Sequence, residues 1–173
     1  SERPNPPNKF IKAYQLAKYL GYRRCAHSSE EYIPMSYVED TIDLLDVERL
    51  SHGIHAWKSE RIVDKILKKS ISVASCPISN YKLKVFEELA DFPLREYLER
   101  GINISINSDD PAPFFAYIGD NMKQVGEVFN LNLKEYEKLA KNSIEASFMT
   151  HEKKIYWKTK IDEYINFYNS NVQ

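Results

Sequence analysis

Two adjacent aspartates, Asp109 and Asp110, end a run of alternating apolar residues in the stretch INISINSDDPAPF, residues 102–114. Like charges side by side raise each other's pKa and cost stability unless a positive group lies near them. A surface turn before Pro111 is one explanation of the pair. A bound metal ion or a basic ligand is the other, and it would give the pair a chemical role.

Polar side chains also follow three earlier apolar stretches. The first group contains His27 and Glu30, the second His52, and the third Cys76 and Asn80. A single histidine in such a place is more often an ordinary hydrogen-bonded residue than a metal ligand. Two histidines with two or three carboxylates on one face, however, match a nitrogen and oxygen site for zinc or a similar metal. The same groups can serve as general acid and base in hydrolysis.

The segments between these groups alternate between helix and strand, at a spacing of roughly 25 to 30 residues, which favours an α/β fold with a parallel sheet. Apolar periodicity predicts four helices alternating with four strands, and further helices from about residue 119 onward. The fourth strand is expected to end at Pro111. The predicted helices cover residues 8–22, 34–46, 59–70 and 92–101, and the predicted strands lie within residues 22–29, 47–56, 70–80 and 102–111.

Parallel strands place their carboxyl ends on one face of the sheet, which is where a (β/α)₈ barrel builds its active site. We therefore expect His27 and His52 to converge with Asp109 and Asp110. Other residues are given structural roles: Cys25 and Cys76 as ordinary thiols, His55 and His151 as surface residues, and the aromatic residues 156–168 of the last helix as core contacts.

The composition is that of a soluble globular protein, with 173 residues, 43% hydrophobic, 28% charged and a net charge of −1. The balanced charge gives no reason to expect nucleic acid or a membrane as partner. No apolar run reaches the roughly 18 residues of a transmembrane helix, and no signal peptide is visible. Two distant cysteines favour a reduced, cytoplasmic protein. We expect a single domain over residues 1–173.

The motifs resemble, in order and spacing, those of the adenosine/adenine deaminase family of metal-dependent purine deaminases. AHSSEE (26–31) looks like the family's His-Ala-Gly-Glu motif and VERLSHGI (47–54) like its Arg-(Ile/Leu)-Asp-His-Gly motif, while CPISN and NSDDP match two later ones. The stretches around them are more similar to adenine deaminases than to adenosine deaminases. The resemblance implies a (β/α)₈ TIM barrel, of which this chain would be the C-terminal half with four parallel strands and additional C-terminal helices.

The resemblance also implies roles for five residues. His27 and Asp109 would be zinc ligands, with one Zn²⁺ per complete active site. Glu30 would protonate N1 of the purine, His52 would orient and deprotonate the zinc-activated water that attacks C6, and Asp110 would hydrogen-bond N7. The implied reaction converts adenine to hypoxanthine and ammonia in purine salvage, and adenosine to inosine is the alternative.

The chain departs from the family pattern in ways that bear on activity. Ser28-Ser29 replace Ala-Gly, Ser51 replaces an Asp, and the family's His-x-His zinc pair does not occur. The chain also starts without Met, so we expect an N-terminal half to be missing. We expect the chain alone to be inactive, with two long open sheet edges that invite self-association. A non-catalytic remnant of the family is the second hypothesis.

Overall fold

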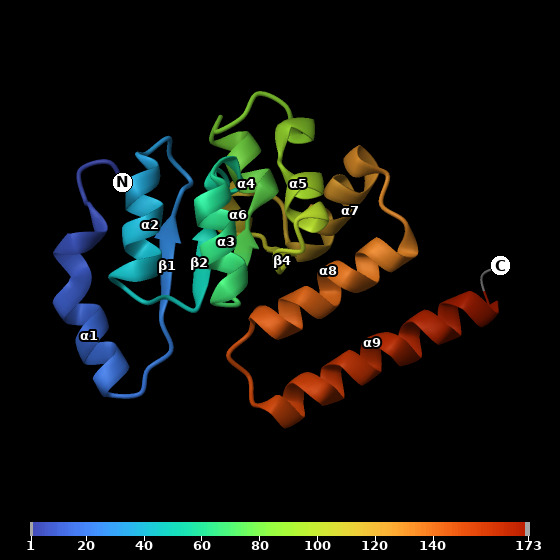
Figure 1. The fold of residues 1–173 in the computed structure, drawn as a ribbon. Helices are drawn as coiled ribbons and strands as arrows, with labels where there is room; N and C mark the ends of the chain where they lie inside the picture. Colours follow the sequence, from blue (N-terminus) through green and yellow to red (C-terminus); the bar gives the residue numbers. More distant parts are fainter. Residues whose placement is uncertain (1, 172–173) are drawn as a thin grey trace.

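The structure, a computed structural model, describes residues 2–171. Four parallel strands form one sheet in the order β1-β2-β3-β4, so strands that are neighbours in the sequence are also neighbours in space (Figure 1). The strands are β1 (Cys25–Ser28), β2 (Arg49–His52), β3 (Ser72–Ser75) and β4 (Ile104–Ile106). The predicted α/β class with a parallel sheet is confirmed.

Helices connect consecutive strands, as parallel pairing requires. The connections contain α2 (Met35–Asp43), then η2 (Ala56–Lys58) with α3 (Glu60–Lys68), and then α4 (Pro77–Lys82), η3 (Leu89–Asp91) and α5 (Leu94–Glu99). Before β1 lie η1 (Pro7–Phe10) and α1 (Ile11–Tyr19), and after β4 lie α6 (Pro111–Phe114), α7 (Ile118–Phe129), α8 (Leu133–Ala146) and α9 (His151–Asn171).

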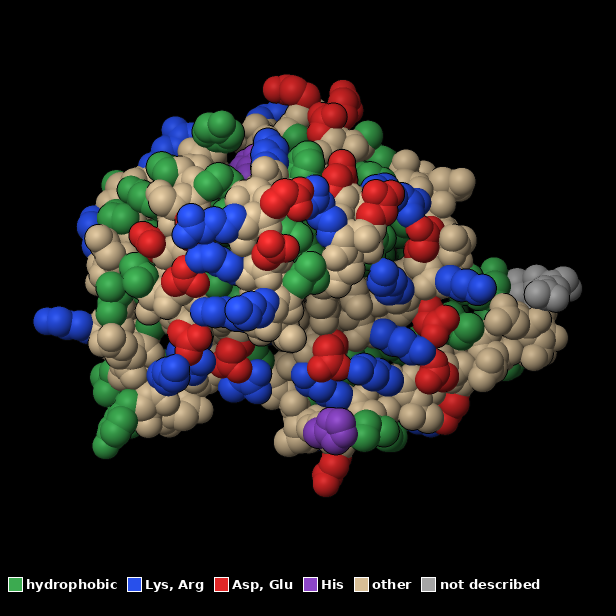
Figure 2. Space-filling model, in the orientation of Figure 1, with side chains coloured by type: hydrophobic (Ala, Val, Ile, Leu, Met, Phe, Trp, Pro, Cys, Tyr) green, Lys and Arg blue, Asp and Glu red, His purple; other side chains and the backbone are tan. Residues whose placement is uncertain are grey.

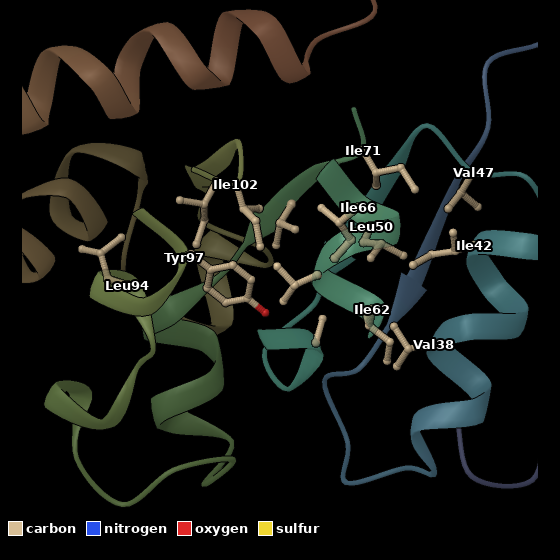
Figure 3. Close-up of a cluster of buried hydrophobic side chains, with 14 of the residues drawn as sticks. Val38, Ile42, Val47, Leu50, Ile62, Ile66, Ile71, Leu94, Tyr97 and Ile102 are labelled. Carbon is tan, nitrogen blue, oxygen red and sulfur yellow. The ribbon is translucent and has the colours of Figure 1, made fainter. Parts of the chain in front are cut away.

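The hydrophobic core lies between the sheet and its connecting helices. Ile42 of α2, Leu50 of β2 and Ile66 of α3 are almost completely buried together, and Tyr97 of α5 joins them (Figure 3). Full burial of each such aliphatic side chain stabilises the fold by about 1.5–3 kcal/mol. This packing holds the strands, and therefore the residues at their ends, in fixed positions.

Local signals set several helix ends where the sequence predicts them. The Ser59 hydroxyl accepts a hydrogen bond from the backbone N–H of Ile62 at 3.4 Å, which caps the start of α3. Gly21 and Gly101 have φ values of +76° and +73° just beyond α1 and α5. Glycine adopts this left-handed conformation without a steric penalty, so both helices end there.

Two expectations about the strands are wrong. The residues after β3 form α4 rather than the end of a strand, because Pro77 is well suited to the first turn of a helix. The edge strands β1 and β4 have only 4 and 3 residues, so the sheet edges are short rather than long. Short edge strands offer few unpaired backbone groups to another chain.

The last helix also differs from expectation, because its aromatic side chains are not core residues. No residue of α9 is buried, and Trp157, Tyr164 and Phe167 are 48%, 65% and 64% exposed. One side of α9 packs along α8, and the rest of the helix lies away from the sheet (Figure 1). The half-buried residues of α9 are Lys154, Lys158, Ile161 and Ile165, a stripe of the helix different from the one that carries the aromatic side chains.

The surface carries intermixed charges. Figure 2 shows Lys and Arg side chains interspersed with Asp and Glu over one whole face of the molecule.

None of the helices within residues 2–171 has the length and apolarity that crossing a bilayer requires.

Candidate active site

The carboxyl ends of the strands bring the two predicted histidines together. His27 is the third residue of β1, and His52 is the last residue of β2. Because β1 and β2 are neighbouring parallel strands, the ring centroids of the two histidines lie 4.5 Å apart. His52 is buried and His27 is about half exposed, with 48% of its side chain accessible. The pair therefore has one protected ring and one ring that solvent can reach.

Glu30 lies between the two histidines. Its Oε2 is 3.2 Å from Nε2 of His27, and its Oε1 is 3.4 Å from Nδ1 of His52. The side-chain amide of Asn80 donates to Oε1 of Glu30 at 2.8 Å and lies 3.3 Å from Nδ1 of His52. Asn80 thus holds Glu30 and His52 in place from α4.

The two aspartates follow β4 and differ in their surroundings. Asp109 accepts a 2.7 Å hydrogen bond from the Ser79 hydroxyl, and its carboxylate lies in one group with ligand atoms of His52 and Cys76. Asp110 is exposed at the N-terminal end of α6 and forms no capping hydrogen bond there. The structure therefore joins Asp109 to the histidine cluster, whereas the substrate role of Asp110 stays a prediction.

Three residues of this region have a left-handed backbone. Ser29, His52 and Asp109 have φ values of +66°, +67° and +56°. Such conformations cost non-glycine residues of order 1–3 kcal/mol and are typical of functional sites, where surrounding contacts enforce them. One such contact comes from Tyr97, whose hydroxyl donates to the carbonyl of Gly53, directly after His52.

Charges and burial shift the pKa values of the cluster in opposite directions. The hydrogen bond to Glu30 raises the pKa of His27 against the effect of burial, with help from the charges of Glu2, Glu30 and Asp109. Burial lowers the pKa of His52, and the nearby His27 adds to this effect. Burial favours the neutral form of Glu30, but the hydrogen bond from His27 and the two histidine charges outweigh it, so the pKa of Glu30 is lowered.

Several residues that position the site carry no role in the sequence-based prediction. Ser79 and Asn80 are two of them, and both belong to the CPISN motif, which is the signal that could have assigned them. The third is Glu2, whose carboxylate accepts hydrogen bonds from the backbone N–H groups of Ser29, Glu30 and Glu31 at 2.5, 3.0 and 2.7 Å. Glu2 therefore fixes the turn that carries Glu30.

His55 is not a surface residue, contrary to expectation. It is only 9% exposed, and its ring packs edge-on against Tyr32 with centroids 5.8 Å apart. Its backbone N–H donates to the hydroxyl of Ser29 at 3.1 Å. His55 is buried because it belongs to the turn directly after β2, and that turn is itself buried. His151 is exposed, as predicted.

The donor chemistry of the cluster fits a metal such as zinc. Within residues 2–171, two groups offer ligand atoms within 4.8 Å of one another: His27, Glu30 and His52 form one, and His52, Cys76 and Asp109 form the other. Imidazole nitrogen, carboxylate oxygen and thiolate sulfur are all zinc ligands in proteins. The implied ligands His27 and Asp109 fall in different groups, with His52 common to both.

A parallel α/β sheet with histidines and carboxylates at its carboxyl ends is the arrangement found in barrel-type metal-dependent hydrolases. The family model described as adenosine deaminase matches residues 1–164. The chain therefore belongs to the adenosine deaminase family, as its motifs predicted.

Individual relatives agree with this assignment. The chain is 39% identical over 164 residues to an adenine deaminase of Ralstonia pickettii (strain 12J), covering 95% of this chain and 47% of that protein. A similar match, 36% identical over 163 residues, is an adenine deaminase of Psychrobacter cryohalolentis, with 94% and 49% covered. The chain thus spans about half the length of the curated relatives it matches.

Solved structures show the same fold. The crystal structure of adenine deaminase from Arthrobacter aurescens superposes with a TM-score of 0.89 at 38% identity, covering 94% of this chain and 49% of that one. An amidohydrolase from Burkholderia ambifaria, solved with bound Zn, has the same TM-score at 24% identity and covers 98% and 48%. The fold of this chain is therefore that of a partial barrel of this class.

Proposed function

We propose that this chain forms the C-terminal half of an adenine deaminase, which hydrolyses adenine to hypoxanthine and ammonia. The observation that carries the proposal is the position of Glu30, whose carboxylate lies within 3.4 Å of both His27 and His52 at the strand ends. A partly buried acid beside two imidazoles is suited to proton transfer to and from a purine. The names of the relatives support adenine as the base.

A zinc ion is the proposed cofactor, with His27 and Asp109 as its ligands from this half. When bound, it supplies the Lewis acid that turns water into a nucleophile near neutral pH. Within this chain, His52 accepts the proton of the attacking water, because burial keeps its ring neutral. Asp110 binds the purine at N7, where its exposed carboxyl group is free to meet a ligand.

Glu30 must carry a proton to protonate N1 of the purine. In this structure the histidine contacts lower its pKa, whereas burial acts in the opposite direction. Loss of the His27 hydrogen bond therefore favours the protonated acid.

By itself, the 173-residue chain supplies two of the proposed zinc ligands, fewer than the usual protein ligand set of three or four. We therefore propose that turnover needs a second half that supplies the remaining ligands, either from an N-terminal segment or from association with another chain. The purified 173-residue chain should release no ammonia from adenine above the buffer rate. Zinc-dependent turnover by that chain would contradict this part of the proposal.

The test of the function uses a complete enzyme that contains this chain and compares adenine with adenosine in the same ammonia-release assay. We expect deamination of adenine and a loss of about 100-fold or more in kcat for Glu30→Gln, because one general acid typically contributes 10²–10⁴. Preference for adenosine would support the alternative substrate, which the family description permits. A folded enzyme inactive on both would support a non-catalytic relative.

A further inference from the structure

The exposed aromatic side chains of α9 lie on one face of the helix. Because an α-helix has about 3.6 residues per turn, positions 156, 157, 164, 167 and 168 fall within roughly one third of its circumference. The stripe that packs toward α8 lies beside this third, and the opposite side carries mainly polar residues. We call the surface the aromatic face; its residues, each between 40% and 65% exposed, are Tyr156, Trp157, Tyr164, Phe167 and Tyr168.

A groove of about 860 Å³ lies between the aromatic face and α8. Trp157, Tyr164 and Tyr168 belong to its wall on α9. The other wall consists mainly of apolar residues of α8 and its flanks, namely Leu131, Leu133, Tyr136, Ala140, Ile144 and Met149. Within residues 2–171 the extensive contacts of α9 are with α8, and Figure 1 shows α9 on the outside of the molecule, beyond α8. The groove is therefore accessible to another molecule.

We infer that a second copy of this chain occupies the groove, so that two copies form a two-fold dimer through α9. In such a dimer the same surface serves both copies and must fit itself. The aromatic face meets this condition, because Tyr156 and Phe167 lie outside the groove whereas the other three residues line it. A two-fold axis can place Tyr156 and Phe167 of each copy into the groove of the other.

The exposed area of the aromatic face matches what a stable dimer requires. An aromatic side chain offers about 150–250 Å², so five that are about half exposed leave roughly 500 Å² on this face. Standard interfaces bury about 800 Å² from each partner, and homodimer interfaces are about 65% apolar. The aromatic face therefore supplies the apolar share of such an interface, and apolar patches of several hundred Å² usually mark interaction sites.

The charges at the groove also favour a copy of the same chain. Its lining contains one basic and one acidic residue, Lys160 of α9 and Glu137 of α8. Under a two-fold axis, Lys160 of each copy can face Glu137 of the partner subunit, so opposite charges meet twice across the interface. Each already has an ion-pair partner in its own copy, Glu163 for Lys160 and Lys141 for Glu137, both at 2.6 Å. Neither charge is therefore left unpaired when the groove is covered.

The open edges of the sheet are a less favourable place for a second copy. At β1 the hydroxyl of Tyr14 donates to the carbonyl of Cys25 at 2.7 Å, and at β4 the side-chain amide of Asn142 donates to the carbonyl of Ile104 at 2.8 Å. The flanking carbonyls of Arg24 and Asn103 bond to β2 and β3, so those of Cys25 and Ile104 point to the open edges. These bonds and the shortness of both strands disfavour strand addition.

The dimer is independent of the proposed reaction. The residues that line the groove and those of the candidate active site do not overlap. Association through α9 therefore leaves the strand ends of both copies open. Its test needs no activity measurement.

The experiment is sedimentation velocity of the purified chain over about 1–100 μM, the range in which moderate dimers dissociate. We expect an equilibrium between a 20.3 kDa monomer and a dimer of twice that mass. Phe167→Glu should weaken the dimer by about 100-fold or more, because loss of one hot-spot aromatic residue costs about 30-fold and a two-fold axis applies the loss twice. Tyr19→Glu on α1 is the matched control and should stay dimeric, since Tyr19 is an 86% exposed aromatic residue away from α9.

Cross-linking adds a measurement that needs no variant. In a mixture of ¹⁴N- and ¹⁵N-labelled chains, we expect mixed-isotope cross-links between Lys153 and Lys160, which share the side of α9 that carries the aromatic face. Far-ultraviolet circular dichroism establishes that each variant is folded, as expected for Phe167→Glu because no residue of α9 is buried.

Three results would overturn the inference. A chain that stays monomeric over the whole concentration range would leave the groove to another occupant, such as an N-terminal segment of a complete enzyme. A dimer that survives Phe167→Glu, or that dissociates in Tyr19→Glu, would place the interface elsewhere. Mixed-isotope cross-links through the α1 lysines instead of those of α9 would assign the association to the β1 edge.

Discussion

The amide nitrogen of Asn80 donates a 2.8 Å hydrogen bond to Oε1 of Glu30, a residue 50 positions earlier in the chain. The same nitrogen lies 3.3 Å from Nδ1 of His52. Asn80 is fully buried, so its position is set by packing within α4. This one side chain therefore connects the proposed acid to the proposed base.

Asn80→Ala should lower the pKa of His52 further, because the contact with Asn80 raises it against the effect of burial. It should also lower kcat of a complete deaminase by about 10- to 100-fold, because Asn80 positions both the proposed acid and the proposed base, and a misplacement of about 1 Å can cost that much. NMR titration of the His52 ring and steady-state kinetics measure the two effects. Asn169→Ala on the exposed side of α9 is the control and should change neither quantity.

The ion pair between His27 and Glu30 should make the free energy of unfolding depend on pH, with a loss of stability at high pH and another at low pH. The raised pKa of His27 contributes stability that is complete below about pH 6.5 and is lost as pH rises through its folded value. The lowered pKa of Glu30 contributes stability that is present above about pH 4.5 and is lost as pH falls through its folded value.

Glu30→Gln tests this window in the metal-free protein. We expect the pKa of His27 to fall, since its hydrogen bond to the carboxylate is the largest cause of the shift. Urea unfolding at several pH values should show a smaller loss of stability above the pKa of His27 than in wild type. Glu87→Gln, at an exposed position, is the control. An unchanged His27 pKa in Glu30→Gln would show that the contact is not formed in solution.

Much of the fold could be predicted from the sequence because its signals are local. The Ser59 cap, the glycines at 21 and 101, and the apolar alternation before Asp109 each act within a few residues. The aromatic residues of α9 were misassigned for the opposite reason. Their spacing is helical, but whether a helical face is buried depends on which other elements reach it, and within residues 2–171 the extensive contacts of α9 are with α8.

The sequence predicts which residue types come together at the strand ends, but not the contacts between them. His27, Glu30 and His52 follow from the strand-end pattern and from the family motifs. The donations from Asn80 to Glu30 and from Ser79 to Asp109 connect residues 50 and 30 positions apart. No periodicity encodes such pairs, because they depend on how α4 is placed after β3. Burial of His55 depends in the same way on the turn after β2.

Gly53 should tolerate substitution less well than Gly21, although both have left-handed backbones with φ of +64° and +76°. A Cβ at position 53 would lie 2.9 Å from Cγ1 of Val73, whereas nothing lies within 4 Å of one at position 21. Gly21→Ala should therefore cost only the backbone strain, about 1–2 kcal/mol. Gly53→Ala should cost about 1–3 kcal/mol more, because it also overpacks the core.

Urea unfolding of both variants measures this difference. Gly53→Ala should also disturb the left-handed turn at His52, which appears as a change in the His52 ring resonances. Equal destabilisation by the two substitutions would mean that Val73 moves aside without cost, and that Gly53 is required only for its backbone conformation.

Glu2→Gln should loosen the turn that carries Glu30. The Glu2 carboxylate accepts three backbone hydrogen bonds, from Ser29, Glu30 and Glu31, and its side chain is only 9% exposed. A hydrogen bond to a charged group contributes about 1.5–3 kcal/mol, and glutamine keeps part of each bond through its carbonyl oxygen. We therefore expect a loss of about 2 kcal/mol in the free energy of unfolding, a net effect no larger than one such bond.

The matched control is Glu60→Gln, which removes a carboxylate whose side chain is 77% exposed and whose partner is Arg100. Surface ion pairs contribute about 0–1 kcal/mol, so this variant should unfold nearly as wild type does. Hydrogen exchange of the Ser29, Glu30 and Glu31 amides adds a local readout. It should accelerate in Glu2→Gln and stay unchanged in Glu60→Gln, because only Glu2 holds those N–H groups; unchanged exchange in both would show that the turn is held by other contacts.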